Sequence, residues 1–108
     1  MLIKFFLTFS KFMENQKLEI DLNIVLEEIY GNCVNSNEKI KDNITIYNLI
    51  HYLDNQKQGF KDLILEEGKI RPYIKILING RHINFLEGLD TILNETDTIA
   101  FFPAVAGG

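Results

Sequence analysis

The dipeptide Asn79-Gly80 is the feature that most narrows how this chain can fold. It follows directly on residues 73–78, an aromatic and β-branched run without a breaker, which is typical of a β-strand. Asn-Gly is the preferred sequence of a type I′ turn, because both central residues of that turn need a positive φ angle. Residues 81–85 are then the return strand, and the pattern predicts a β-hairpin over residues 73–85.

Two segments near the start of the chain are expected to form a second hairpin. Residues 2–9 are β-branched and aromatic and show no helical stripe. Residues 17–22 alternate polar and apolar side chains with a period of two, which indicates a half-buried strand. The short polar stretch at residues 14–16 is the turn between them.

One amphipathic helix is expected between the two hairpins. Asn43 or Thr45 can cap its first turn, and Gln58-Gly59 ends it. Its apolar residues recur at the spacing of one buried stripe: Ile46, Leu49, Ile50 and Leu53. Such a stripe needs a sheet to pack on, so one helix lying across a single mixed sheet is the economical arrangement. The predicted fold class is therefore α+β, with a β-grasp sheet of four or five strands.

Residues 23–41 fit this arrangement least well. The apolar residues between positions 24 and 30 could form about two helical turns, which Gly31 would stop. We interpret residues 23–41 as a loop-like insertion into a single domain that spans residues 1–108.

Composition excludes several classes of protein. A net charge of -4 without a basic stripe gives no reason to expect nucleic-acid binding. The apolar start lacks the basic leader and cleavage site of a signal peptide, and no apolar run approaches the ~18–20 residues that span a bilayer. A single cysteine, Cys33, cannot form an internal disulfide or a structural metal site alone. We expect a cytoplasmic protein without a membrane partner.

The end of the chain differs in character from the rest. Residues 98–102 read as the last strand, which Pro103 stops. The two glycines at the end, Gly107 and Gly108, lose the most backbone entropy on ordering. We therefore expect a flexible C-terminal tail over residues 104–108.

Residues 70–91 and 99–108 resemble the β-grasp sulfur carriers of the MoaD and ThiS group, which are ubiquitin-like proteins. The similarity is greatest to the small subunit of molybdopterin synthase of archaeal type. It is carried, in order and at family spacing, by the Asn79-Gly80-Arg81 hairpin, the Phe102-Pro103 strand end and the terminal Gly107-Gly108.

Two departures from the family pattern stand out. Glu95-Thr96-Asp97 occupies the place where the family usually has an Asp-Gly-Asp turn, which implies a different turn type before the last strand. Residues 23–41 are also longer than the corresponding stretch of the family. We expect the first departure to affect stability more than chemistry.

The resemblance implies a role for the C-terminal carboxylate of Gly108. In such carriers this carboxylate attacks the α-phosphate of ATP inside an adenylating activating enzyme, and a sulfur donor then converts the acyl-adenylate to a thiocarboxylate. Gly107 gives clearance in a narrow channel, because glycine has no Cβ. The carrier itself then needs no bound cofactor, metal or catalytic side chain, and ATP is used by the activating enzyme.

Four residues are candidates for partner binding: Phe102, Pro103, Val105 and Arg81. If Ile99 and Phe101 face the helix, alternation leaves Phe102 exposed beside the tail, where a large aromatic side chain can anchor a partner. Arg81 is either a solvated hairpin residue or the donor of a salt bridge to a partner.

Three functions remain open from the sequence. The leading hypothesis is the small, non-catalytic subunit of molybdopterin synthase, whose tail enters the large catalytic subunit and delivers sulfur in molybdenum cofactor biosynthesis. The second hypothesis is a ubiquitin-like modifier joined through Gly108 to lysines. The third is a sulfur carrier for tRNA thiolation or for thiazole or cysteine synthesis.

Overall fold

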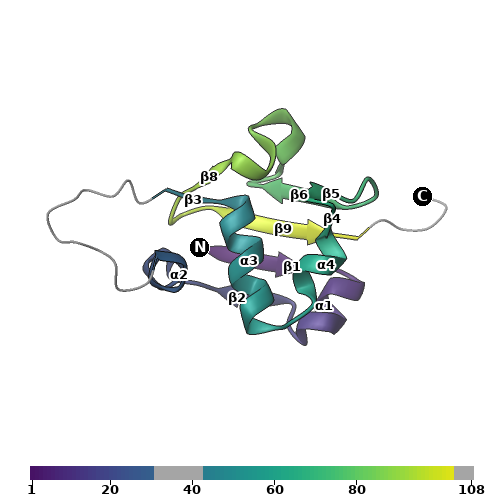
Figure 1. Ribbon diagram of the computed structural model, residues 1–108, viewed down its shortest axis with the longest axis horizontal. Helices are drawn as coiled ribbons and strands as arrows, with labels where there is room; N and C mark the ends of the chain where they lie inside the picture. The colour runs from purple at the N-terminus through teal and green to yellow at the C-terminus, as the bar shows by residue number, and fades with distance from the viewer. Residues whose placement is uncertain (31–42, 104–108) are drawn as a thin grey trace, which may run out of the picture.

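Five strands form one mixed sheet, and the main helix lies across it (Figure 1). The computed structural model describes residues 1–30 and 43–103. The strand order is β2-β1-β9-β6-β7, in which β1 and β9 run parallel and the other neighbours run antiparallel. The strands are β1 (Leu2–Phe5), β2 (Lys17–Glu19), β6 (Lys75–Ile78), β7 (Arg81–His82) and β9 (Thr98–Phe102). The predicted β-grasp architecture is confirmed.

The described part of the chain also contains two small antiparallel sheets and two 3₁₀ turns outside the five-stranded sheet. Two small antiparallel sheets pair β3 (Ile44–Thr45) with β8 (Ile92–Leu93) and β4 (Leu65–Glu66) with β5 (Lys69–Ile70). The 3₁₀ turns η1 (Ile83–Phe85) and η2 (Gly88–Asp90) form the connection that follows β7.

Helix α3 (Ile46–Gln56) is the element that the stripe predicted. Thr45 caps it: its hydroxyl accepts from the Asn48 N–H at 3.2 Å, and the Asn48 side chain accepts from the Thr45 N–H at 3.0 Å. This reciprocal pair satisfies two backbone donors of the first turn. The whole stripe is fully buried against the sheet: Ile46, Leu49, Ile50 and Leu53.

Aromatic rings join the two layers. Phe60, the first residue of α4 (Phe60–Ile64), meets Phe5 of β1 and Phe101 of β9 edge-to-face, with ring centroids 5.8 and 5.3 Å apart. Phe9 also meets Phe60 at 5.8 Å. Such pairs stabilise a fold beyond the area that they bury.

The first strand is shorter than the sequence indicated. β1 ends at Phe5, and α1 (Thr8–Met13) begins at positions 8 and 9, which we expected to belong to the strand. Leu7 turns the chain with a φ angle of 54°, and the Ser10 hydroxyl donates to the Leu7 carbonyl at 2.8 Å. The aromatic residues of this helix pack on the core, so burial of an apolar face outweighs strand propensity here.

We expected residues 23–41 to form a loop-like insertion, and this expectation is wrong for residues 23–30. Residues Leu22–Tyr30 form α2, and residues 31–42 lie outside the described part of the chain. The Asp21 carboxylate accepts from the Asn23 N–H at 2.9 Å, which is the pattern of a helix cap. A helical stripe packs on the core: Leu22, Val25, Leu26 and Ile29. Our assignment of Leu22 to a strand had hidden this stripe.

The Asn79-Gly80 hairpin forms as expected, with φ angles of 53° and 86° at its central residues. Its return strand is only Arg81–His82, because the chain turns into η1 there. The His82 ring nitrogen accepts from the Asn84 N–H at 3.0 Å and stabilises that turn. The expected return strand over residues 81–85 is therefore partly wrong.

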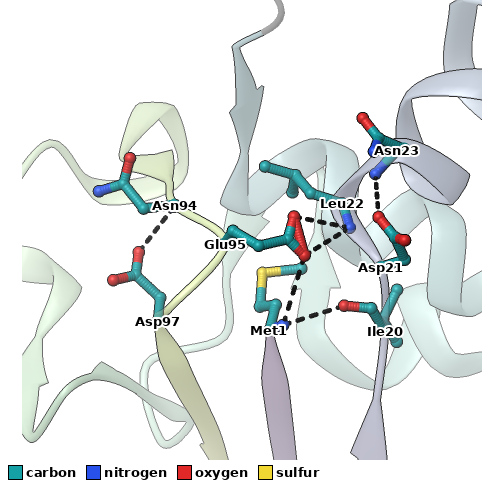
Figure 2. Close-up of polar contacts among 8 residues, drawn as sticks. All are labelled: Met1, Ile20, Asp21, Leu22, Asn23, Asn94, Glu95 and Asp97. Carbon is teal, nitrogen blue, oxygen red and sulfur yellow. Dashed lines mark hydrogen bonds and ion pairs between the residues drawn. The ribbon is translucent and has the colours of Figure 1, made fainter.

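The turn before β9 has no glycine and is stabilised by hydrogen bonds to the Asp97 carboxylate instead. The buried Asp97 carboxylate accepts from the Asn94 N–H at 2.8 Å and from the Asn79 side-chain amide at 2.9 Å (Figure 2 draws the first contact). Asn79 in turn accepts from the Thr98 N–H at 3.0 Å. One carboxylate thus links this turn to the neighbouring hairpin.

Glu95 extends the same turn toward the start of the chain. Its carboxylate accepts from the Leu22 N–H at 3.2 Å and lies 3.8 Å from the Met1 ammonium group (Figure 2). That ammonium group also donates to the Ile20 carbonyl at 3.0 Å. Glu95 therefore stabilises the first turn of α2, where a negative charge is favourable.

We expect Asp97→Ala to lower the free energy of unfolding by about 1–3 kcal/mol, because it removes the hydrogen bonds that the buried carboxylate accepts from Asn94 and Asn79. Urea denaturation measures this loss. Asp90→Ala removes an exposed carboxylate from η2 and serves as the matched control, with an expected change within about 0.5 kcal/mol. Equal effects of the two substitutions would contradict the role of Asp97.

Candidate functional site

The site that the sequence indicated begins where β9 ends. β1 and β9 run side by side toward the end of the molecule where α1 and α4 lie (Figure 1). Phe102 is the last residue of β9, and Pro103 is the last described residue; we call these two residues the tail root. Val105, Gly107 and Gly108 lie outside the described residues.

The two faces of β9 have different environments. Ile99 and Phe101 share one face, as alternation predicted, and both are fully buried on the helix-covered side. Phe102 points to the other side and is half-buried, because it stacks on Phe6 with ring centroids 4.2 Å apart and planes 9° apart. The Phe6 N–H donates to the Phe101 carbonyl at 3.2 Å, which fixes Phe6 beside the strand end. The aromatic anchor at the tail root is thus a pair of rings.

We call the side of the sheet opposite α3 the open face. Within residues 1–30 and 43–103, none of the strand side chains that alternate onto this side is buried. Its apolar centre consists of Phe6, Leu77, Ala100 and Phe102. Lys75 is the cross-strand neighbour of Phe102, and Lys4 is the neighbour of both Ala100 and Lys17. Lysines therefore border the apolar centre on two sides, although the chain as a whole carries a net charge of -4.

Arg81 does not join this group. It pairs with Ile78, which in turn pairs with Ile99, so it lies about 10 Å along the sheet from Phe102. Residues directly opposite each other share a face, and Ile78 is buried on the helix side. The structure therefore separates Arg81 from the tail root by both position and face.

Pro103 borders a second feature, a surface hollow of about 350 Å³ on the α1 side. Arg71 is fixed at its wall, because its guanidinium donates to the Asp62 carbonyl at 2.8 and 3.1 Å. The remaining lining includes exposed apolar surface of Leu63 and Tyr73. The tail root thus lies between the open face and this hollow.

The sequence analysis missed the surroundings of two phenylalanines, Phe6 and Phe85. Phe6 was taken as part of a strand, and its partner becomes visible only once β1 is known to pair with β9 in parallel. Phe85 is 82% exposed and meets the His82 ring edge-to-face at 6.4 Å. Because we expected Phe85 to belong to the return strand over residues 81–85, its exposure could not be predicted from the sequence.

The described residues contain little that points to other chemistry. Within residues 1–30 and 43–103, no cluster of three or more His, Cys, Asp or Glu side chains could hold a metal ion. None of the helices in this part of the chain is long and apolar enough to cross a membrane. Burial, with the charge of Glu28 adding to it, raises the pKa of the Tyr52 phenol on α3, on the side of the sheet opposite the open face.

Comparison with known proteins decides the family, because residues 20–108 match the ThiS family. The chain belongs to the ThiS family. Small archaeal modifier protein 3 of Haloferax volcanii is 31% identical over 70 residues, which cover 65% of this chain and 76% of that protein.

Solved structures of other proteins show the same fold. A chain of the BexX/CysO complex of Amycolatopsis orientalis has a TM-score of 0.73 at 18% identity, covering 99% of this chain and 98% of its own. Small archaeal modifier protein 1 of Methanosarcina acetivorans has a TM-score of 0.67 at 24% identity, covering 99% and 94%. The chain is a sulfur carrier or a ubiquitin-like modifier of the ThiS and MoaD type, and the resemblance noted in the sequence is confirmed.

We expect Phe6 and Phe102 to be energetically coupled. In a double-mutant cycle of Phe6→Ala and Phe102→Ala, the coupling free energy should be about 0.5–1.5 kcal/mol, the value of a stacked aromatic pair. Urea denaturation of the four proteins measures it. The cycle of Phe6→Ala with Phe85→Ala is the control, and coupling no larger than in this control would argue against the stack.

Proposed function

We propose that the chain is a sulfur carrier that is loaded at the Gly108 carboxylate and serves as the small subunit of molybdopterin synthase. The observation that carries the proposal is the tail root: a strand that ends in a stacked aromatic pair on the open face and leads into the Gly107-Gly108 terminus. Membership of the ThiS family, which extends through residue 108, supports it.

The chemistry proceeds in two transfers. A Gly108 carboxylate oxygen attacks the α-phosphorus of ATP, and pyrophosphate leaves. The outer sulfur of a persulfide donor then attacks the carbonyl carbon of the acyl-adenylate, and AMP leaves. A thiol next attacks the donor's sulfur in the resulting acyl disulfide, which releases the thiocarboxylate and leaves the donor and the thiol joined as a disulfide. Both transfers occur in the activating enzyme, so the carrier contributes a carboxylate and a way to present it.

The tail root supports this presentation. Five residues beyond Pro103 span at most about 16–18 Å when extended, which is enough to enter a channel in a partner protein. Meanwhile the open face can bind the partner's surface through its apolar centre. Its lysines favour a partner surface that carries acidic side chains, because complementary charge speeds association.

A ubiquitin-like modifier is the second candidate, and one observation favours it. The curated relative at 31% identity is named as a small archaeal modifier protein. In that function the Gly108 carbonyl carbon forms an isopeptide bond with a lysine amine, and the activating group leaves. The same tail root and open face would serve both functions.

Incubation with ATP, an activating enzyme and a sulfur donor tests the loading step. We expect the intact mass to rise by the exchange of one oxygen atom for sulfur. Deletion of Gly108 should abolish this change and leave the melting temperature within a few degrees, because the tail adds little to the core. No mass change with any activating enzyme tested would refute the carrier function.

The acceptor is tested separately. Conversion of a pterin precursor to molybdopterin by the loaded chain and a large synthase subunit would support the first candidate. Isopeptide remnants of the chain on cellular lysines, without that conversion, would support the modifier instead.

We expect Phe102→Ala to raise the KM of the activating enzyme for the carrier by about tenfold, because it removes an anchor worth about 1–2 kcal/mol. Adenylation measured by pyrophosphate release gives KM and kcat. Phe85→Ala is the matched control, since this exposed phenylalanine contacts His82 on β7, two strands away from β9, and its effect should stay within about twofold. Equal effects would show that binding does not centre on Phe102.

A further inference from the structure

Strand β2 is one edge of the five-stranded sheet, and no other strand of the described part pairs with its outer side. Such an edge presents unpaired N–H and C=O groups to which a further strand can bind. The backbone hydrogen bonds of the residues that flank β2 show which of its N–H and C=O groups are unpaired. Ile20 exchanges both backbone bonds with Met1, at 2.9 and 3.0 Å, and the Gln16 carbonyl accepts from Phe5 at 2.9 Å.

Hydrogen-bonding direction alternates along an antiparallel strand. Since residues 16 and 20 bond toward β1, residue 18 does so as well, and the N–H and C=O groups of Lys17 and Glu19 point away from the sheet. The Lys17 and Glu19 side chains are both exposed, and no hydrogen bond or ion pair joins either to another described residue.

We propose that β2 pairs with β2 of a second copy of this chain across a two-fold axis at Leu18, forming a continuous ten-stranded sheet. In this register Lys17 lies opposite Glu19 of the second copy, and Glu19 lies opposite Lys17. In both pairs the backbone N–H and C=O groups point away from their own sheet and toward the other copy, so both pairs can form backbone hydrogen bonds. The proposal does not depend on the proposed function.

Charge selects this register over its neighbours. An axis at Lys17 sets two lysines opposite each other, and an axis at Glu19 sets two glutamates opposite each other. Like charges directly opposite destabilise a strand pair, whereas opposite charges stabilise it. Lysine on an edge strand normally prevents such pairing. Here Glu19, two residues after Lys17, lies opposite the Lys17 of the other copy, so the lysine favours pairing between two copies.

A second feature of Lys17 favours an anion beside it. Within the sheet, Lys17 lies directly opposite Lys4, a like-charge pair on the open face. Glu19 of the second copy would lie next to this pair and offset its repulsion. No acidic side chain of the same chain forms an ion pair with either lysine in the described part.

Leu18 supplies the apolar part of the contact. It lies opposite the buried Ile3, so its side chain points to the helix side of the sheet. There it borders a hollow of about 300 Å³ whose lining includes Met13, Ile24 and Tyr52. In the proposed register the two Leu18 side chains form a close pair at the axis and cover part of each hollow. Because each strand has only three residues, the association is weak and depends on protein concentration.

Sedimentation equilibrium of the full chain over a range of concentrations tests the pairing by charge reversal. Lys17→Glu and Glu19→Lys each create two like-charge pairs in the dimer, and each should weaken the association by about tenfold. The double variant Lys17→Glu/Glu19→Lys restores opposite charges and should return to within about threefold of the native value. Circular dichroism checks that the exposed substitutions preserve the fold.

Lys75→Glu is the matched control, because it makes the same charge change on the open face, away from β2. Its association should equal that of the native chain. Amide hydrogen exchange adds a site-specific measurement: Lys17 and Glu19 should gain protection at high concentration, while Leu18 is protected throughout. A native chain that stays monomeric, a double variant as weak as the single ones, or a Lys75→Glu variant equally weakened would overturn the proposal.

Discussion

The parallel pairing of β1 with β9 is the interaction on which the other features depend. It places Phe5 beside Phe101 on the buried side, where both rings contact Phe60. It also places Phe6 against Phe102 on the open face. A single register between two strands thus determines both the aromatic core and the aromatic pair at the tail root.

The elements with strong local signals could be predicted from the sequence. The Asn79-Gly80 turn, the Thr45 cap and the buried stripe of α3 depend on residues close to one another along the chain, and all three are confirmed. α1 was mistaken for strand, because Phe9 helps to cover Phe60, a contact with a distant residue. α2 was interpreted as part of a loop for a similar reason, since the distant residue Glu95 stabilises its first turn.

The candidate site was predictable in part. Alternation along β9 correctly placed Ile99 and Phe101 on one face and Phe102 on the other, and the structure shows that the face of Ile99 and Phe101 is the buried one. The partner of Phe102 could not be found, because Phe6 meets it only through the β1–β9 register. The distance between Arg81 and the tail root also follows from strand pairing, which a single sequence does not give. The roles of Val105, Gly107 and Gly108 remain proposals.

The position of β9 in the sheet has a consequence for biosynthesis. β9 lies between β1 and β6 in the sheet, yet it follows both of them along the chain, so both leave the ribosome before it. Until then β1 lacks its parallel neighbour, and the long-range contacts that complete the core cannot form. A nascent chain interrupted before Phe102 would therefore expose apolar surface and become a substrate for chaperones and proteases. Cellular quality control would in this way remove truncated chains that lack β9 and the residues after it.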